Sequence, residues 1–331
     1  MNPAPPDRRF AYGLRFESAF ELPDLPPSEF HGAPDVLIET AQTLPRAEVE
    51  RLSAPGGPIE NVIRFSDQAA SVLFLQIARF TVEGGSRIVV EPIEGTSAST
   101  WRLPLLGSVM AFLLEQRGWL ALHAGAVEMP DADGAPVACA FAADKGQGKS
   151  TLGAALSLAG YPLFCDDVLA LEPPEGDSRL PPNALVGFGS MKLVPDAVRG
   201  VLGASPDALP RVAPELEGLD VVDKRYFMAP LAKRSRPLRH VFLLASHDDV
   251  ARQEIELRPL SPQEALVQLF PHTFAARWGE WYLNGARRSA HFRACARIAG
   301  NCQVWELSRR RDLALLPQTI ERVARLVGSR G

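Results

Sequence analysis

The stretch 143–151 contains the residues of this chain whose types and spacing point most clearly to chemistry. The apolar segment 136–142 before it predicts a strand, and the segment 152–159 after it predicts a helix that ends at Gly160. A strand, a glycine-bearing loop that ends in Gly-Lys-Ser, and a helix together form the arrangement of a phosphate-binding loop. The sequence therefore predicts a nucleoside triphosphate site here.

Each residue type in this loop has a separate task. Gly146 and Gly148 let the backbone curl so that successive N–H groups point at phosphate oxygens. The Lys149 ammonium reaches the β- and γ-phosphates, and the Ser150 hydroxyl is a ligand for Mg²⁺. We therefore expect ATP and Mg²⁺ as cofactors. The candidate cofactor-binding residues are Asp144, Lys145, Gly146, Gln147, Gly148, Lys149, Ser150 and Thr151.

The first position of the loop departs from the usual pattern, because Ala143 stands where the pattern has glycine. Alanine is compatible with that position if the backbone there stays in an ordinary extended region. The alternative is a chance Gly-Lys-Ser in an ordinary turn between a strand and a helix. The predicted strand and helix on either side favour the nucleotide site.

Asp166 and Asp167 form the second chemical signal, because they end the next predicted strand after the loop helix. Ligands of open α/β sheets bind beyond the carboxyl ends of strands. One carboxylate there can hold Mg²⁺, and the other can accept a proton from an attacking hydroxyl. The alternative is that one aspartate only caps a turn. We interpret the similar pair at 248–249 as a turn.

His123 opens the strand that is expected to pair with the strand leading into the loop. A single histidine is more often structural than catalytic. The neighbouring loop nevertheless makes His123 a candidate catalytic residue beside the two aspartates.

The three signals occur in a recognisable order. Leu122-His123-Ala124-Gly125, then the Gly-Lys-Ser loop, then Cys165-Asp166-Asp167 resemble the kinase core of the HPr kinase/phosphorylase family. More specifically, the chain resembles the HPr-kinase-like proteins encoded with lasso-peptide biosynthesis genes.

The resemblance implies a P-loop kinase with a serine hydroxyl as acceptor. It also implies that His123 and Asp166 form the proton-handling pair and that Asp167, with Ser150, attends the metal. Lys145 departs from the family's usual serine, and no glutamate signature for the reverse, phosphorolytic activity is found. The resemblance covers the segment 122–167, and a looser similarity extends from there to the C-terminus.

The segment 187–195 resembles a substrate-side loop of the same relatives, and residues 223–225 resemble their Lys/Arg position. We therefore expect Lys192, Lys224 and Arg225 to contact phosphate oxygens or an acidic peptide. The alternative for these three cations is ordinary surface charge.

Composition limits the partners and the organisation of the chain. A net charge of −4 argues against general nucleic-acid binding, and no apolar run is long enough to span a membrane. No secretory signal pattern is seen, so a cytoplasmic location is expected. We predict an α/β fold, with α+β character in a mixed sheet. It would comprise a strand-rich region at 1–100, for peptide recognition, and an HPr-kinase-like P-loop kinase domain at 101–331.

The sequence favours an ATP- and Mg²⁺-dependent serine kinase acting on a peptide or small protein, most specifically a lasso-peptide precursor at a C-terminal serine. Two alternatives stay open. One is a kinase for HPr, another carrier protein or a small hydroxylated metabolite. The other is a nucleotide-binding regulator without turnover. The acceptor and a homo-oligomeric state cannot be decided from the sequence.

Overall fold

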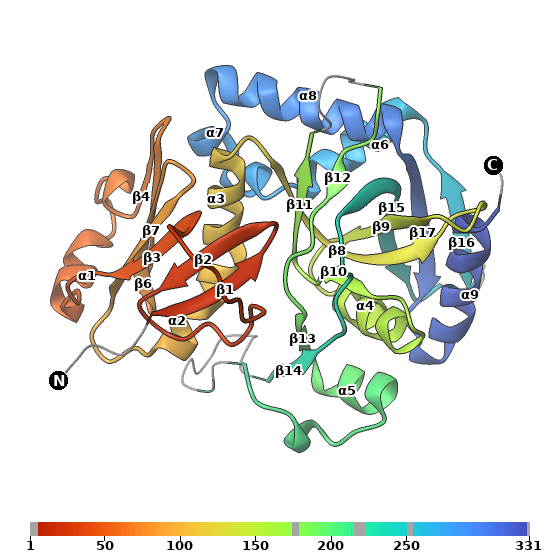
Figure 1. Ribbon diagram of the computed structural model, residues 1–331, viewed down its shortest axis with the longest axis horizontal. Helices are drawn as coiled ribbons and strands as arrows, with labels where there is room; N and C mark the ends of the chain where they lie inside the picture. Colours follow the sequence, from red (N-terminus) through yellow and green to blue (C-terminus); the bar gives the residue numbers. More distant parts are fainter. Residues whose placement is uncertain (1–5, 174–178, 213, 215–222, 250–253, 330–331) are drawn as a thin grey trace. The chain divides into compact units, whose positions relative to one another are not determined.

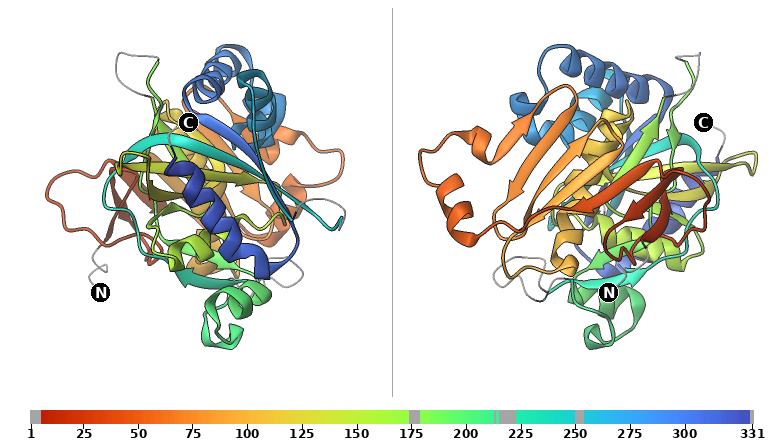
Figure 2. Two further views of the ribbon diagram at one scale, coloured as in Figure 1. Left: turned by 90° about the vertical axis from the view of Figure 1, so that its right-hand side faces the viewer. Right: turned by 60° about the vertical axis from the view of Figure 1, so that its left-hand side comes forward.

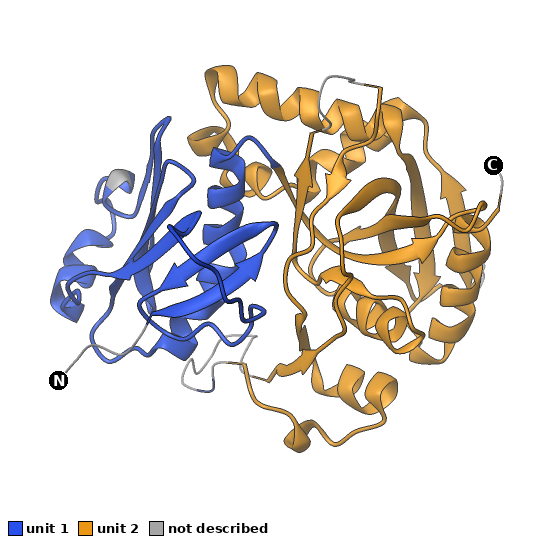
Figure 3. Cartoon of the chain, viewed as in Figure 1, with its two compact units in different colours: residues 1–119, 213–222 blue, residues 120–212, 223–331 orange. Residues whose placement is uncertain are grey.

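The computed structural model describes residues 6–173, 179–212, 214, 223–249 and 254–329. The chain forms two compact units, of which the first covers 6–119 and the second covers 120–212 and 223–329 among these residues (Figure 3). The first unit thus extends past the boundary expected after residue 100. The fold is α/β with mixed sheets, as the sequence predicted.

The first unit is built on a seven-stranded sheet in the order β1-β2-β3-β7-β6-β5-β4. Alternating burial along its strands gives the sheet one buried face, as period-two patterning requires. The strands are β1 (Asp7–Ala11), β2 (Leu14–Ser18), β3 (Val36–Thr40), β4 (Ile63–Phe65), β5 (Ala69–Phe74), β6 (Ala78–Glu83) and β7 (Arg87–Pro92). The helices are α1 (Arg46–Leu52), α2 (Ala98–Pro104), a π-helical segment (Leu105–Val109) and α3 (Met110–Gln116).

Two local predictions for this unit differ from the structure. The alternating residues 10–16 predict a single strand. The structure instead has a hairpin of β1 and β2, because Tyr12 and Gly13 take φ values of 56° and 76° and reverse the chain. The apolar run 105–116 predicts one helix. The structure is helical over this run but is kinked at Gly107 in the π-helical segment, and helical structure begins earlier, at Ala98. The helical residues 98–116 belong to this unit, which explains why the unit does not end at residue 100.

The second unit is built on an eight-stranded mixed sheet (Figure 1). Its strands are β8 (Leu120–Pro130), β9 (Pro136–Ala143), β10 (Leu163–Cys165), β11 (Val168–Glu172), β12 (Asn183–Ala184), β15 (Arg236–His247), β16 (Ile255–Pro259) and β17 (Gln303–Arg310). A separate pair consists of β13 (Ser190–Leu193) and β14 (Arg225–Met228). Its helices are α4 (Lys149–Leu158), α5 (Pro195–Leu202), α6 (Pro262–Leu269), α7 (Gly279–Tyr282), α8 (Gly285–Asn301) and α9 (Leu316–Val327).

Helices cover both faces of this sheet, and β9 shows why. Its residues alternate between two apolar clusters: Cys139 and Phe141 pack with α4, α5 and α9, whereas Ala140 and Ala142 pack with α6 and α8. Figure 2 shows α9 lying across its face of the sheet. A strand that is apolar on both sides is typical of such a covered sheet, which explains the unbroken apolar run before the loop.

Three strands from distant parts of the chain end together at one edge of this sheet. β15 runs parallel to β9 and to β17, with Leu244 opposite both Ala143 and Leu307. The carboxyl ends of parallel strands meet at one edge, where ligands of such sheets bind. The residues that follow Ala143 therefore lie beside the ends of β15 and β17.

The buried His240 of β15 makes the second unit sensitive to acid. Burial, assisted by Arg239, lowers the pKa of His240 to about 4, and its Nδ1 has no hydrogen-bond partner in the described part of the chain. The unfolded chain takes up this proton below about pH 6.5, whereas the folded chain does so only near pH 4. Stability is therefore lost as the pH falls through this window.

We expect His240→Phe to lose less stability than the wild type between about pH 7 and about pH 4. The difference should reach up to about 3 kcal/mol in the free energy of unfolding. Urea unfolding at both pH values measures it, and carboxylate titration is common to both proteins and cancels. An equal loss in the two proteins would show that His240 carries no such penalty.

Candidate nucleotide and phosphoryl-transfer site

The loop after β9 has the backbone geometry of an anion cradle. Gly146 and Gly148 take φ values of 88° and 84°, a left-handed region that favours glycine. Helix α4 then starts at Lys149, and its Leu152 N–H bonds to the Gly148 carbonyl at 2.9 Å. Ala143 is the last residue of β9, so its backbone is extended and no glycine is required there.

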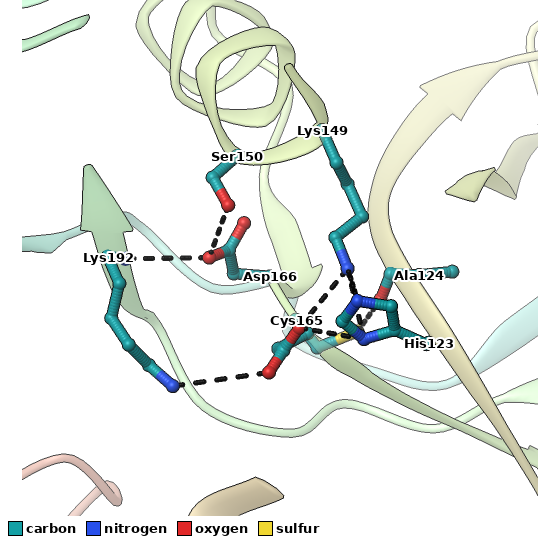
Figure 4. A network of polar contacts seen from close by, with 8 residues as sticks. His123, Ala124, Lys149, Ser150, Cys165, Asp166 and Lys192 are labelled. Atoms are coloured by element: carbon teal, nitrogen blue, oxygen red, sulfur yellow. Dashed lines mark hydrogen bonds and ion pairs between the residues drawn. The ribbon is translucent and has the colours of Figure 1, made fainter. Parts of the chain in front are cut away.

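Ser150 and Asp166 form one half of the polar network at this loop. The Ser150 Oγ donates to Asp166 Oδ2 at 3.0 Å (Figure 4). Asp166 is 4 % exposed, and its Oδ1 is buried with no hydrogen-bond partner among the described residues. Burial raises the pKa of Asp166, against the opposing effect of Lys149. A buried carboxylate oxygen without a partner beside a hydroxyl is a position suited to a cation.

His123, Lys149 and Asp167 form the other half. Asp167 Oδ1 lies 2.9 Å from His123 Nδ1 and 3.1 Å from Lys149 Nζ. Lys149 Nζ also lies 2.9 Å from Nε2 of His123. The same ammonium lies 3.1 Å from Nδ1, so Lys149 does not distinguish the two ring nitrogens. The Asp167 carboxylate does, because it faces Nδ1 and favours the neutral tautomer that carries its proton there.

The electrostatics of this half keep the aspartate ionised and the histidine neutral. Burial lowers the pKa of His123, although Asp167 opposes the shift. Burial would raise the pKa of Asp167, but Lys149 and His123 outweigh it and hold that pKa well below its usual value. An ionised carboxylate next to a neutral imidazole is an arrangement that can accept a proton.

The contacts in the structure differ from the pairing that the resemblance implies. The proton-handling pair was expected to be His123 with Asp166, but His123 bonds to Asp167, and Asp166 bonds to Ser150. The two aspartates are consecutive in the bend between β10 and β11, so their side chains diverge to opposite partners. Gly125 permits this close approach, because a Cβ there would stand 3.2 Å from the Asp166 carbonyl oxygen.

The predicted substrate-side cations have different surroundings. Lys192 Nζ lies 4.0 Å from Asp167 Oδ2. Lys224 comes directly before β14, whose Arg225 and Tyr226 lie opposite Leu193 and Lys192 of β13. Burial lowers the pKa of Lys224, and Lys192 lowers it further, against the opposing effect of Asp166 and Asp167. Arg225 is instead buried and donates to the backbone carbonyls of residues 206, 223 and 224. It therefore holds the local chain together and is not presented to the site.

The remaining loop residues are distributed around its rim. Asp144 is exposed and lies 3.9 Å from Nδ1 of His272, and Lys145 is exposed as well. The Gln147 side chain contacts the Ser246 hydroxyl at the end of β15. Thr151 lies in the first turn of α4 and lines a cavity beside the loop.

Sequence reasoning missed two neighbours of the site. Phe274 packs edge-on against His123, with ring centroids 5.4 Å apart. Arg309 reaches the loop at Gly148 from the end of β17. The basic run at 309–311 was the available signal for Arg309.

The donor set fits Mg²⁺. A serine hydroxyl and carboxylate oxygens are the hard oxygen ligands that this ion prefers. Over the described ranges, no group of three or more His, Cys, Asp or Glu side chains could hold a metal by itself. Mg²⁺ is commonly bound by one or two carboxylates together with substrate phosphates, so Ser150 and Asp166 would be its protein ligands.

Membrane attachment through a spanning helix finds no support here. None of the helices in the described part of the chain combines the length and apolar character of a membrane crossing.

Comparisons with known proteins give distant similarity to solved structures alone. No protein-family model and no curated protein sequence matches the chain. Among solved structures, the chain is similar to the HPr(Ser) kinase/phosphatase from Coxiella burnetii, at 16% identity, with 62% of this chain and 90% of that chain covered and a TM-score of 0.28. A similarity of this size carries no argument about fold or function, so the geometry of the site is the basis for its interpretation.

Proposed function

We propose that this chain is an ATP- and Mg²⁺-dependent kinase that phosphorylates a hydroxyl group, specifically a serine of a peptide. The observation that carries the proposal is the meeting of a phosphate-binding loop with two differently partnered carboxylates. Asp166 is held by Ser150, and Asp167 is held by Lys149 and His123. Binding alone does not need the second carboxylate, whereas transfer to a hydroxyl needs a proton acceptor.

The residues divide the reaction between them. The loop N–H groups and Lys149 hold the phosphates and stabilise the charge that develops on the γ-phosphoryl group. The serine oxygen forms a bond to the γ-phosphorus while the bond to the β-phosphate oxygen breaks and ADP leaves. The proton of the serine hydroxyl passes to Asp167, whose carboxylate is oriented by His123 Nδ1. Mg²⁺, when bound, neutralises charge on the β- and γ-phosphate oxygens.

The proposed acceptor is a lasso-peptide precursor that presents a serine at its C-terminus. Lys192 and Lys224 lie near Asp167, and two ammonium groups there would complement a terminal carboxylate. The resemblance of residues 122–167 to the lasso-associated kinases points to the same acceptor class. The first unit offers the edge strand β4, and an extended peptide could add to such an edge.

Mass spectrometry tests the acceptor directly. The protein is incubated with ATP, Mg²⁺ and either precursor peptides that end in serine, the same peptides with that serine replaced by alanine, or HPr. We expect one added phosphoryl group on the serine peptides and none on the alanine peptides. Phosphorylation of HPr alone would show that the acceptor is a carrier protein and not a peptide. ATP binding without transfer to any hydroxyl would instead favour a nucleotide-binding regulator.

A further inference from the structure

A cavity of about 340 Å³ adjoins the loop on the side of β17. It lies within the second unit, at the sheet edge where β9, β15 and β17 end. Its size falls within the range of small-molecule sites. Its lining comes from the loop with the first turn of α4, from the start of α5, and from the end of β17 with the segment that follows it. The lining includes Gly148, Val194, Asp196, Arg309, Asp312 and Leu313.

Arg309 is the unusual residue of this cavity. It is 6 % exposed, and its Nε is buried without a hydrogen-bond partner in the described residues. Its Nη2 stands so close to the loop that a Cβ on Gly148 would be 2.5 Å from it. Burial lowers its pKa, and no carboxylate of the described residues counteracts the shift.

The next two residues, Arg310 and Arg311, already have polar partners. Arg310 pairs with Glu254 at 2.8 Å and with Asp312 at 3.6 Å. Arg311 donates to the Ser246 hydroxyl at 3.2 Å. Arg309 thus differs from its neighbours in being buried, cationic and unmatched. A buried charge is costly unless an opposite charge is brought to it, so this guanidinium is suited to an anionic ligand.

We propose that Arg309 binds the phosphate chain of the nucleotide from the side opposite His123, and that the cavity receives the ribose and base. The inference rests on the proposed function, because it takes the loop as a nucleotide site. β9 lies between β8, which carries His123, and β15, which is followed by β17. The acceptor and the nucleoside would therefore approach the loop from different sides.

The rest of the lining suits a nucleoside better than further phosphate. Asp196 and Asp312 line the cavity, where Asp196 pairs with Arg199 and Asp312 with Arg310. Their carboxylates would repel phosphate but could accept further hydrogen bonds from sugar hydroxyls. Val194 and Leu313 add apolar surface for a base. Positive charge is concentrated at Arg309 beside the loop, and negative charge lies farther along the cavity wall.

The test compares ATP–Mg²⁺ affinity, measured by calorimetry, in Arg309→Met, Arg309→Lys and a matched control. Arg258→Met is the control, because it removes the same charge from the neighbouring strand β16. Arg258 pairs with Glu264 and Glu306 and lies outside the cavity lining. We expect Arg309→Met to weaken binding by about 10- to 100-fold, the usual effect of a charged hydrogen bond. Arg309→Lys should weaken binding less, and Arg258→Met should not change it.

A second measurement separates a binding role from a structural role. The melting temperature of Arg309→Met without nucleotide is expected to equal or exceed that of the wild type, because an unmatched buried charge is removed. Binding by Arg309→Met within twofold of the wild type overturns the inference, and so does an equal loss in the Met and Lys variants. If Lys149→Met also leaves binding intact, the nucleotide site itself is wrong, which distinguishes the two failures.

Discussion

Asp167→Asn is expected to lower phosphoryl transfer by roughly 10²–10⁴-fold, the usual cost of removing a general base. The amide cannot accept the hydroxyl proton, and it also replaces the anion that orients His123 through Nδ1. Nucleotide binding should persist, because the loop N–H groups and Lys149 are unchanged. Single-turnover transfer and ATP affinity, measured on the same preparation, separate the two effects.

The neighbouring variant Asp166→Asn provides the contrast. Asp166 bonds to Ser150 and carries the unpartnered Oδ1. Its replacement should therefore raise the Mg²⁺ concentration needed for half-maximal transfer while leaving transfer at saturating Mg²⁺ closer to the wild-type rate. If Asp166→Asn loses transfer at every Mg²⁺ concentration and Asp167→Asn instead responds to Mg²⁺, then the roles are reversed from those proposed here.

Lys149→Met should remove most of the stabilisation that ATP and Mg²⁺ give to the folded protein. A ligand that binds only the native state raises stability in proportion to the logarithm of its concentration over Kd, and the loss of Lys149 raises Kd. Methionine keeps an apolar stem in a position that is only 9% exposed, so gross unfolding is avoided. Thermal unfolding with and without ATP–Mg²⁺ measures the effect.

Lys233→Met is a suitable control for this experiment, because Lys233 is an exposed lysine in the same unit and lies outside the loop and its cavity. It should retain the full ATP-dependent rise in Tm. If Lys149→Met shows an undiminished ATP-dependent rise in Tm, the loop is not part of the nucleotide site. A Tm of the unliganded Lys149→Met variant far below that of the wild type would assign Lys149 a structural role.

Local patterns predicted the fold around the loop well. The apolar run before Ala143 indicated β9, and the segment after Thr151 indicated α4, because both signals lie within a few neighbouring residues. The hairpin at Tyr12 was missed because Tyr12 is a non-glycine residue with positive φ, which sequence patterns do not signal. The helix start at Ala98 was missed because Pro104 lies inside the helical stretch.

The site was predictable in its residue types but not in its pairings. Asp166 and Asp167 were identified as a functional pair from their place after a strand. Which of them meets His123 depends on how the bend at these two residues packs against Gly125, a contact between separate strands. Arg225 was expected at the substrate because of its charge, whereas burial directs it to backbone carbonyls. The sequence identifies Arg225 as a cation, but the direction of its side chain follows only from the fold.

The order of strands at the loop also has a consequence for folding during synthesis. β9 is synthesised early, but its parallel partner β15 comes much later, and β17 later still. During synthesis the apolar strand β9 emerges before its partners β15 and β17 have been made, and such non-local pairings form slowly. A nascent chain that carries the complete Gly-Lys-Ser loop therefore still lacks the two strands whose ends lie beside that loop in the folded unit.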